Sequence, residues 1–209
     1  MKKEQNAEKT KVRKLARTKE KVSQWTTNPL NEKVLDYHNY EMTKSESVLY
    51  FVAAFLVGGV VSQFFYGGLF QEDGVPTLLT YISNSAAFVI VGLLVGKVFL
   101  PVRSRQLAEK RRDTLRRQFR DMLESLTASL AANSTVRDAF SSAYTDMCMQ
   151  YSDDALISKE LDQFRRAEQI NVTLDVMMDD FAKRSGVEEI QDFNNVFQVC
   201  YGPGGNMSR

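Results

Sequence analysis

Two long uncharged stretches constrain this chain more than any other feature. Residues 47–70 read SVLYFVAAFLVGGVVSQFFYGGLF and residues 77–96 read TLLTYISNSAAFVIVGLLVG, and neither contains Asp, Glu, Lys or Arg. Each is as long as the roughly 20 apolar residues that a helix needs to cross a bilayer. The alternative is a core helix of a soluble domain, but an uncharged run of this length is rare there. We therefore predict two membrane spans, over about 47–70 and 77–100.

The charges around the two stretches predict their orientation. The short loop between them carries Glu72 and Asp73 and no Lys or Arg, whereas residues 1–44 hold eleven Lys and Arg against six Asp and Glu. Residues 103–120, after the second stretch, hold eight against two. Because basic flanks stay on the cytoplasmic side, we expect a multi-pass protein of the cell (inner) membrane with both termini in the cytoplasm.

The chain before the first stretch, residues 1–46, reads as a basic cytoplasmic tail. Its first 28 residues are polar and rich in Lys, which predicts disorder and an attraction to anionic membrane lipid. Nucleic acid is not an expected partner, because only Trp25 offers a ring on which bases would stack. Leu30, Val34 and Tyr37 fall at helical spacing, which predicts a short juxtamembrane helix lying on the membrane.

The third segment, residues 101–209, reads as helices throughout. Apolar residues recur at the spacing of an amphipathic helix in five successive runs, and no run alternates with the period of a strand. One apolar face per helix predicts an antiparallel bundle that buries these faces together. The fold class is therefore all-α, with a two-span transmembrane helical hairpin followed by a cytoplasmic bundle of about five helices. The faces are marked by Phe119, Met122 and Leu126; Ala139, Phe140 and Met147; Leu161, Phe164 and Ala167; Met177, Met178 and Phe181; and Ile190, Phe193 and Phe197.

Two breaks between the apolar runs share one pattern. Asn133 and Asn171 stand where a helix ends, and Asn tolerates the left-handed conformation that closes a helix. Thr135 and Thr173 follow two residues later, where a Thr side chain satisfies the first free amides of the next helix. The pattern predicts two helical hairpins of the same build.

Glycines in the second uncharged stretch predict close helix packing. Gly92 and Gly96 form a G-x-x-x-G pattern, which lets a neighbouring helix approach closely. The neighbour is either the first span, through Gly58 and Gly59, or another protein. The alternative is that glycine is simply common in membrane helices. Neither stretch contains the charged side chains that usually mark an ion path.

The chain offers no clear catalytic, cofactor or metal site. Asp153 and Asp154 are neighbours that point about 100° apart on a helix, and we expect them to cap the third helix of the bundle. Metal binding by these two carboxylates together with Glu160 remains the alternative. Gly204 and Gly205 do not match a phosphate-binding loop, because no Lys follows them. We therefore predict a protein that is not an enzyme, with no cofactor and no resident metal.

Four segments of the helical part together resemble a known family. They are QFRDMLESLTASLAANSTVRDAF at 118–140, SKELDQF at 158–164, INVTLDVMMDDFAKRSG at 170–186 and FNNVFQVCYGPGGN at 193–206. In this order, after a pair of spans, they resemble the cytoplasmic domain of type II secretion system F proteins. The B-type inner-membrane protein of tight-adherence (Flp) pilus assembly is the most similar kind. The resemblance covers residues 103–209.

The resemblance implies a non-enzymatic assembly platform. Such a protein would couple a cytoplasmic secretion ATPase to pilin subunits, together with a second F-type membrane protein, in a homo- or hetero-oligomer. Two features depart from the family. Asn133 and Asn171 replace the usual Gly at the hairpin turns, and the family continues past the GGN turn into a sixth helix and a second pair of spans. Gly204 and Gly205 therefore look like the hinge to a missing helix, and the chain looks C-terminally truncated.

The contact with the ATPase is expected in one of two places. One is the acidic face of the bundle, since residues 121–209 hold seven Lys and Arg against fifteen Asp and Glu. The other is the basic connector, at Arg111, Arg112, Arg116 and Arg117. The alternative for these arginines is that they only fix the orientation and meet lipid. The rival function for the whole chain is a membrane-anchored helical adaptor or signalling protein that recruits a cytoplasmic partner.

Overall fold

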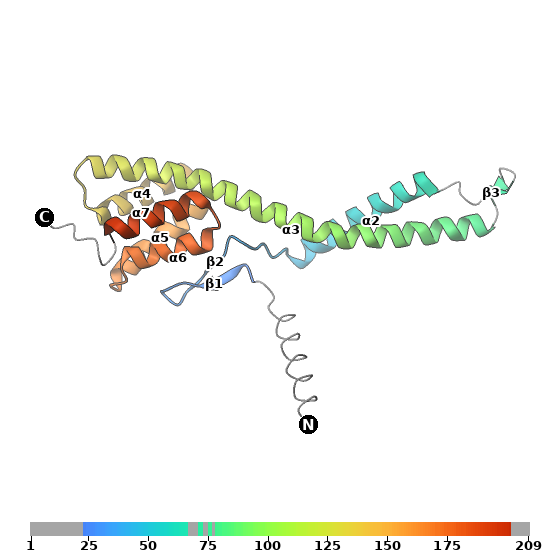
Figure 1. Ribbon diagram of the computed structural model, residues 1–209, viewed down its shortest axis with the longest axis horizontal. Helices are drawn as coiled ribbons and strands as arrows, with labels where there is room; N and C mark the ends of the chain where they lie inside the picture. The colour runs from blue at the N-terminus through green and yellow to red at the C-terminus, as the bar shows by residue number, and fades with distance from the viewer. Residues whose placement is uncertain (1–22, 67–70, 73–74, 77, 202–209) are drawn as a thin grey trace, which may run out of the picture. The chain divides into compact units, whose positions relative to one another are not determined.

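The structure is a computed structural model that describes residues 23–66, 71–72, 75–76 and 78–201 (Figure 1). This part of the chain is mostly helical, as predicted, and divides into two compact units. We name residues up to Asn39 and from Ala108 onward the core unit, and Tyr40–Leu107 the apolar unit. The helices are α2 (Lys44–Tyr66), α3 (Leu78–Ala131), α4 (Val136–Tyr151), α5 (Leu156–Gln169), α6 (Leu174–Ser185) and α7 (Glu188–Tyr201). The strands are β1 (Trp25–Thr27), β2 (Lys33–Leu35), β3 (Gln71–Glu72) and β4 (Val75–Pro76).

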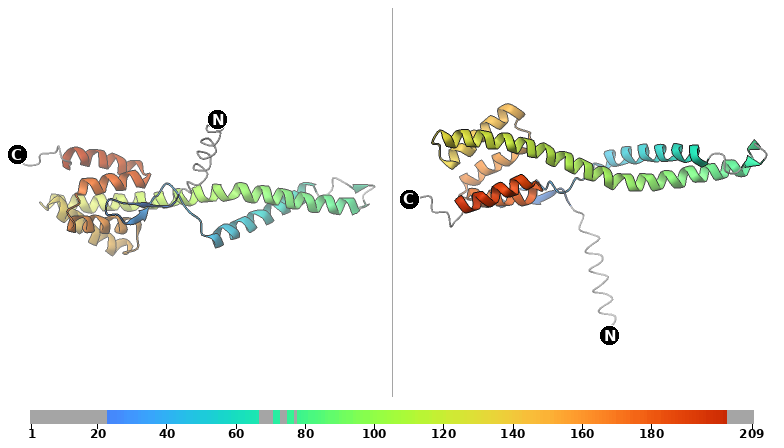
Figure 2. Two further views of the ribbon diagram at one scale, coloured as in Figure 1. Left: turned by 90° about the horizontal axis from the view of Figure 1, so that it is seen from below. Right: turned by 45° about the horizontal axis from the view of Figure 1, so that its top comes forward.

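The core unit is organised around one cluster of buried apolar side chains. The C-terminal part of α3 and all of α4, α5, α6 and α7 contribute to it, which Figure 2 shows as helices gathered in one group. Within it the Phe181 ring contacts that of Phe119 in a tilted arrangement and that of Phe164 edge to face. Most of the apolar positions that the helical spacing marked are buried in this cluster. The exceptions include Phe193, Leu123, Val136, Tyr144 and Tyr201, which are partly buried, and Leu130 and Cys200, which are exposed.

The two Asn–Thr breaks lie at turns between helices, as predicted. Asn133 (φ 61°) and Asn171 (φ 59°) both adopt the left-handed conformation. Thr135 precedes α4 and its hydroxyl accepts a hydrogen bond from the Asp138 amide at 3.2 Å. Thr173 precedes α6 in the same way, but its side chain makes no capping hydrogen bond. The predicted left-handed conformation is therefore confirmed at both Asn residues. The predicted capping hydrogen bond is confirmed at Thr135 but not at Thr173.

The helix α3 runs without a break through the boundary that the sequence suggested near residue 100. It has 54 residues and includes Pro101. A proline within a helix removes one backbone donor, and here the helix continues on both sides of it. The second apolar stretch and the first helix of the core unit are therefore one helix.

The segment before α2 corrects one prediction. No helix forms there within residues 23–43; instead β1 and β2 pair as an antiparallel hairpin, with Thr26 opposite Val34. Asn28 and Pro29 give the local reason. The Asn28 side-chain oxygen accepts hydrogen bonds from the amides of Leu30 (3.0 Å) and Glu32 (2.8 Å), and proline disfavours a helical residue before it.

The hairpin also faces a different environment from the predicted one. Val34 and Tyr37 are buried at 3 % and 1 % exposure within the protein, so they do not lie on a membrane surface. The predicted disorder of residues 1–28 is wrong for the segment from Trp25, which belongs to β1. Residues 1–22 are outside the described part of the chain.

In the apolar unit, α2 and α3 contact each other through glycines. Gly92 and Gly96 of α3 lie against the rings of Phe55 and Phe51, while Gly59 of α2 lies against Phe88. Both helices are long and apolar enough to cross a membrane. Only 22 % of the apolar window in α2 and 11 % of that in α3 is buried inside the protein. Most of their apolar surface therefore has no protein partner in this structure.

A side chain at Gly92 tests the contact between α2 and α3. A Cβ atom there would lie 2.9 Å from the backbone oxygen of Phe55. We expect Gly92→Leu to lower the free energy of unfolding of the full chain in detergent by about 1–3 kcal/mol, the usual cost of overpacking. The control is Ala53→Leu, at an exposed position of α2. An equal loss of stability in both variants would contradict the packing.

Candidate functional site

The core unit contains a buried ion pair that joins α5 to α6. Glu160 of α5 is 2 % exposed and Arg184 of α6 is 5 % exposed. Two guanidinium nitrogens of Arg184 donate to the two carboxylate oxygens of Glu160, at 2.8 and 3.1 Å. The Nε of Arg184 donates to Asp180 at 2.7 Å. A bidentate pair of this kind fixes both distance and orientation.

The same two side chains hold the β1–β2 hairpin. The Tyr37 hydroxyl donates to Glu160 Oε1 at 2.9 Å, and the Tyr37 amide donates to the Arg184 carbonyl at 3.0 Å. Arg184 also donates to the carbonyl of Leu35 at 2.8 Å. We name Tyr37, Glu160, Asp180 and Arg184 the hairpin anchor. It ties the chain just before α2 to helices more than a hundred residues later.

Contacts around the anchor extend this attachment. The side-chain amide nitrogen of Asn28 donates to Gln163 Oε1 at 3.2 Å, and both residues are buried. Arg166 forms an ion pair with Glu32 at 3.1 Å, on the surface. The hairpin is therefore bound along α5 at several points and not only through Tyr37.

Burial and the neighbouring charges together set the protonation states of Tyr37 and Arg184. Burial raises the pKa of Tyr37 well above its usual value of 10.0, and the negative charge of Glu160 raises it further. Burial lowers the pKa of Arg184, but hydrogen bonds and charge attraction from Glu160 and Asp180 outweigh it, so this pKa is raised. At neutral pH the tyrosine stays a neutral donor and the arginine stays charged. Such an arrangement binds and orients a chain segment.

The four arginines expected to bind a partner lie on α3 in different surroundings. Arg116 is paired within the protein, with Glu189 and Asp113, each at 2.9 Å. Arg111 donates to Gln24 Oε1 at 3.4 Å. Arg112 is half-buried near Gly186, whereas Arg117 is exposed. The structure therefore does not gather the four into one site, and only Arg117 among them is both exposed and free of ion pairs with described residues.

The carboxylates that were considered as alternative metal ligands have separate partners. Glu160 belongs to the hairpin anchor, while Asp154 forms a surface ion pair with Lys159 at 3.0 Å. Within the described residues no group of three potential metal-ligating side chains occurs. The capping prediction is wrong, because the N-cap of α5 is Ala155 and it makes no side-chain capping bond. Glycines 204 and 205, the expected hinge, lie outside the described residues.

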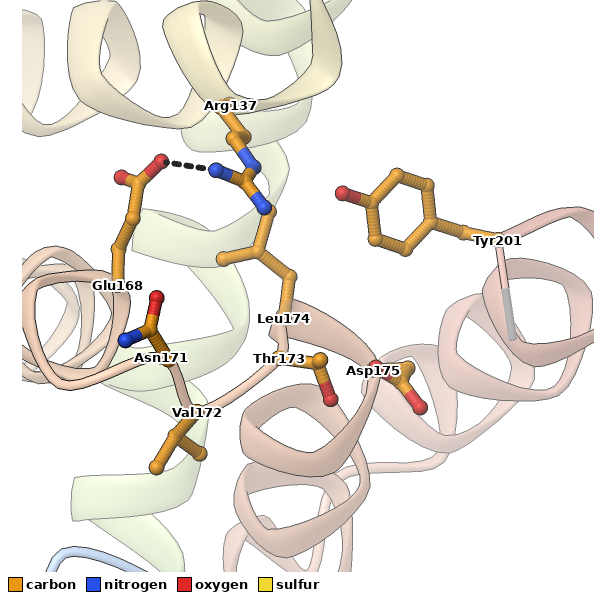
Figure 3. Close-up of a pocket in the computed structure, with 8 residues that line it drawn as sticks. All are labelled: Arg137, Glu168, Asn171, Val172, Thr173, Leu174, Asp175 and Tyr201. Atoms are coloured by element: carbon orange, nitrogen blue, oxygen red, sulfur yellow. Dashed lines mark ion pairs between the residues drawn. The ribbon is translucent and has the colours of Figure 1, made fainter. Parts of the chain in front are cut away.

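One open hollow of about 590 Å³ lies where α5 turns into α6 (Figure 3). Arg137 and Glu168 form an ion pair of 3.4 Å at its edge, and the Tyr201 ring faces them across the hollow (Figure 3). The rest of the wall comes from Asn171, Val172, Thr173, Leu174 and Asp175. These groups offer hydrogen bonds and one ion pair.

Two charged residues on otherwise apolar helix faces could have indicated the anchor from the sequence. Glu160 lies on the apolar face of α5 with Ile157 and Leu161, and Arg184 lies one turn after Phe181 on that of α6. A charged residue on an apolar helix face needs a buried partner of opposite charge. That rule suggests a Glu160–Arg184 pair, but Tyr37 gives no comparable signal.

Comparison of the chain with family models, with curated proteins and with solved structures finds no match.

Removing one member of the buried pair should strongly destabilise the core unit. We expect Glu160→Ala to lower the free energy of unfolding of the full chain by about 3–5 kcal/mol, because Arg184 would remain charged and buried. Glu124→Ala, at an exposed position without an ion pair to described residues, is the control. If Glu160→Ala fails to fold, the double variant Glu160→Met, Arg184→Met should restore folding. Equal stability of Glu160→Ala and the control would refute the buried pair.

The anchor also predicts a dependence on alkaline pH. The raised pKa of Tyr37 means that its stabilising contribution is present below about pH 10 and is lost as the pH rises through the folded-state value. We expect Tyr37→Phe to be less stable than wild type by about 1–3 kcal/mol at neutral pH. The difference should shrink in strongly alkaline solution, as measured by unfolding across a pH series. A difference that does not change with pH would contradict the assigned hydrogen bond.

Proposed function

We propose that this chain is a non-enzymatic component of an inner-membrane assembly platform of the type II secretion F type, most similar to that of tight-adherence pili. In this role it couples a cytoplasmic secretion ATPase to the assembly of pilin subunits. The proposal combines the resemblance of residues 103–209 with the geometry of the hairpin anchor.

The exposed apolar surface of α2 and α3 supports the membrane part of the proposal. Phe64 and Phe65 at the end of α2 are 87 % and 72 % exposed, and much of the remaining apolar unit is equally uncovered. A soluble protein rarely leaves apolar surface of this extent in water. We infer that α2 and the first part of α3 form a two-span hairpin in the cell membrane. Both termini then lie in the cytoplasm and β3–β4 outside.

The observation that carries the coupling role is that the core unit is joined to the apolar helices twice. The helix α3 enters it without a break, and the hairpin anchor holds the chain at Tyr37, seven residues before α2 begins at Lys44. We propose that a displacement of α5 or α6 reaches the two apolar helices through these two covalent connections.

The helical body supports the F-type assignment in a second way. It packs five apolar helix faces together, and Asn133 and Asn171 supply the left-handed turns for which the family uses Gly. We propose that these helices form an antiparallel bundle and that the ATPase binds its acidic surface together with the exposed Arg117. Arg111 and Arg116 already have contacts within the chain.

Purification of the full chain from native membranes in mild detergent tests this function. We expect mass spectrometry to identify a secretion ATPase and a second F-type membrane protein in the same complex. Arg117→Glu should reduce the amount of ATPase that co-purifies with the chain several-fold. It should not change the fraction of the chain that remains in membranes after an alkali wash. Lys183→Glu, which reverses an exposed charge on α6, is the control. Recovery of the chain alone, or with signalling proteins, would favour the membrane-anchored adaptor instead.

A further inference from the structure

The basic side chains of three core helices, α4, α5 and α6, differ from those of the apolar unit. In α4, α5 and α6 every Lys and Arg belongs to an ion pair within the protein. They are Arg137, Lys159, Arg165, Arg166, Lys183 and Arg184. The core unit therefore satisfies the cations of these helices internally, and most of them lie at the surface.

The apolar unit contains four cations and pairs none of them with an acid of the described chain. They are Lys44, Lys97, Arg103 and Arg105. The nearby Glu46 uses its carboxylate to accept a hydrogen bond from the Thr43 amide at 2.9 Å. The four cations thus outnumber Glu41 and Glu46, the acids near the start of α2, and no ion pair joins them to described residues.

Arg103 shows most clearly that an acidic partner is lacking among the described residues. Its guanidinium lies over the Tyr50 ring, 5.1 Å from the centroid, and donates to Gln106 at 3.2 Å. Its Nε is buried and has no hydrogen-bond partner. A guanidinium has five N–H donors, so this side chain keeps donors on its terminal nitrogens for an oxyanion beyond the contacts with Gln106 and Tyr50. Within the described residues no carboxylate takes that place.

The four cations gather at one end of the apolar unit. Ser104 donates to the Tyr40 carbonyl at 2.7 Å, Arg103 reaches the Tyr50 hydroxyl at 3.5 Å, and Gly96 lies against Phe51. The start of α2 therefore lies beside α3 near residues 96–104. Residues 45–96 contain no Lys or Arg, so the other end of the unit carries no positive charge.

We propose that this end of the apolar unit binds the phosphate groups of anionic phospholipids, with Arg103 and Arg105 as the principal ligands and Lys44 and Lys97 beside them. The inference rests on the membrane location in the proposed function. Cations that follow or precede a membrane-spanning apolar stretch lie at the level of the lipid headgroups, where their stems stay in apolar surroundings. An anionic headgroup supplies the acceptors that the chain lacks, and it attracts basic residues near its surface.

Native mass spectrometry of the full chain in mild detergent tests the inference. The probe is an equimolar mixture of phosphatidylglycerol, which is anionic, and phosphatidylcholine, which is zwitterionic. We expect the wild-type chain to retain several-fold more of the anionic lipid. The triple variant Lys97→Gln, Arg103→Gln, Arg105→Gln should lose most of this preference.

The matched control removes the same number of charges from the core unit. Arg137→Gln, Lys159→Gln, Lys183→Gln changes three exposed cations and should leave the lipid preference unchanged. The inference is overturned if wild type retains both lipids equally, or if the control loses as much anionic lipid as the triple variant. Loss of lipid preference together with a wild-type unfolding curve in the triple variant would support a direct site.

Membrane retention separates this inference from the function on which it rests. If alkali washing removes the wild-type chain from membranes, the proposed membrane location fails and the lipid site fails with it. If the chain is retained but shows no preference for the anionic lipid, only the lipid site is wrong. The lipid site is also wrong if an acidic protein binds at Arg103 and Arg105 and phosphatidylglycerol does not displace it.

Discussion

The buried pair of Glu160 and Arg184 is the interaction on which the core unit depends. It joins α5 to α6 with two hydrogen bonds and supplies the acceptor and donor that hold Tyr37 and Leu35. Two charges without water are costly unless every polar group has a partner. The hairpin completes that set, so its attachment and the stability of α5–α6 are linked.

This link gives the N-terminal segment a role beyond that of a charged tail. Because Tyr37 is fixed shortly before α2 begins, and α3 continues into the core unit, both apolar helices start or end at the same body. The proposed platform function needs a connection that transmits displacement. The proposed lipid site, in contrast, uses the cations that this body does not pair. The two proposals therefore draw on different residues.

Sequence reasoning identified the helices and their turns because these depend on local pattern. Apolar spacing located the buried faces, and Asn133 and Asn171 were recognised as left-handed turn residues. It predicted a helix for the segment that forms the β1–β2 hairpin, because the spacing of Val34 and Tyr37 fits a helix as well as a strand segment packed on a core. It placed the arginines of α3 together, whereas tertiary contacts gave Arg111 and Arg116 separate partners.

The sequence by itself determined the mostly helical fold, the two apolar helices and the faces that pack, since each follows from the chemistry of neighbouring residues. Only the tertiary structure decided that Tyr37 is an anchor residue and that Glu160 is buried and paired with Arg184. The partners of these residues lie 123 and 24 positions away along the chain. Spacing within one helix contains no information about a partner at such a separation. The contact exists because burial of Arg184 and Glu160 leaves hydrogen-bonding groups that the hairpin satisfies.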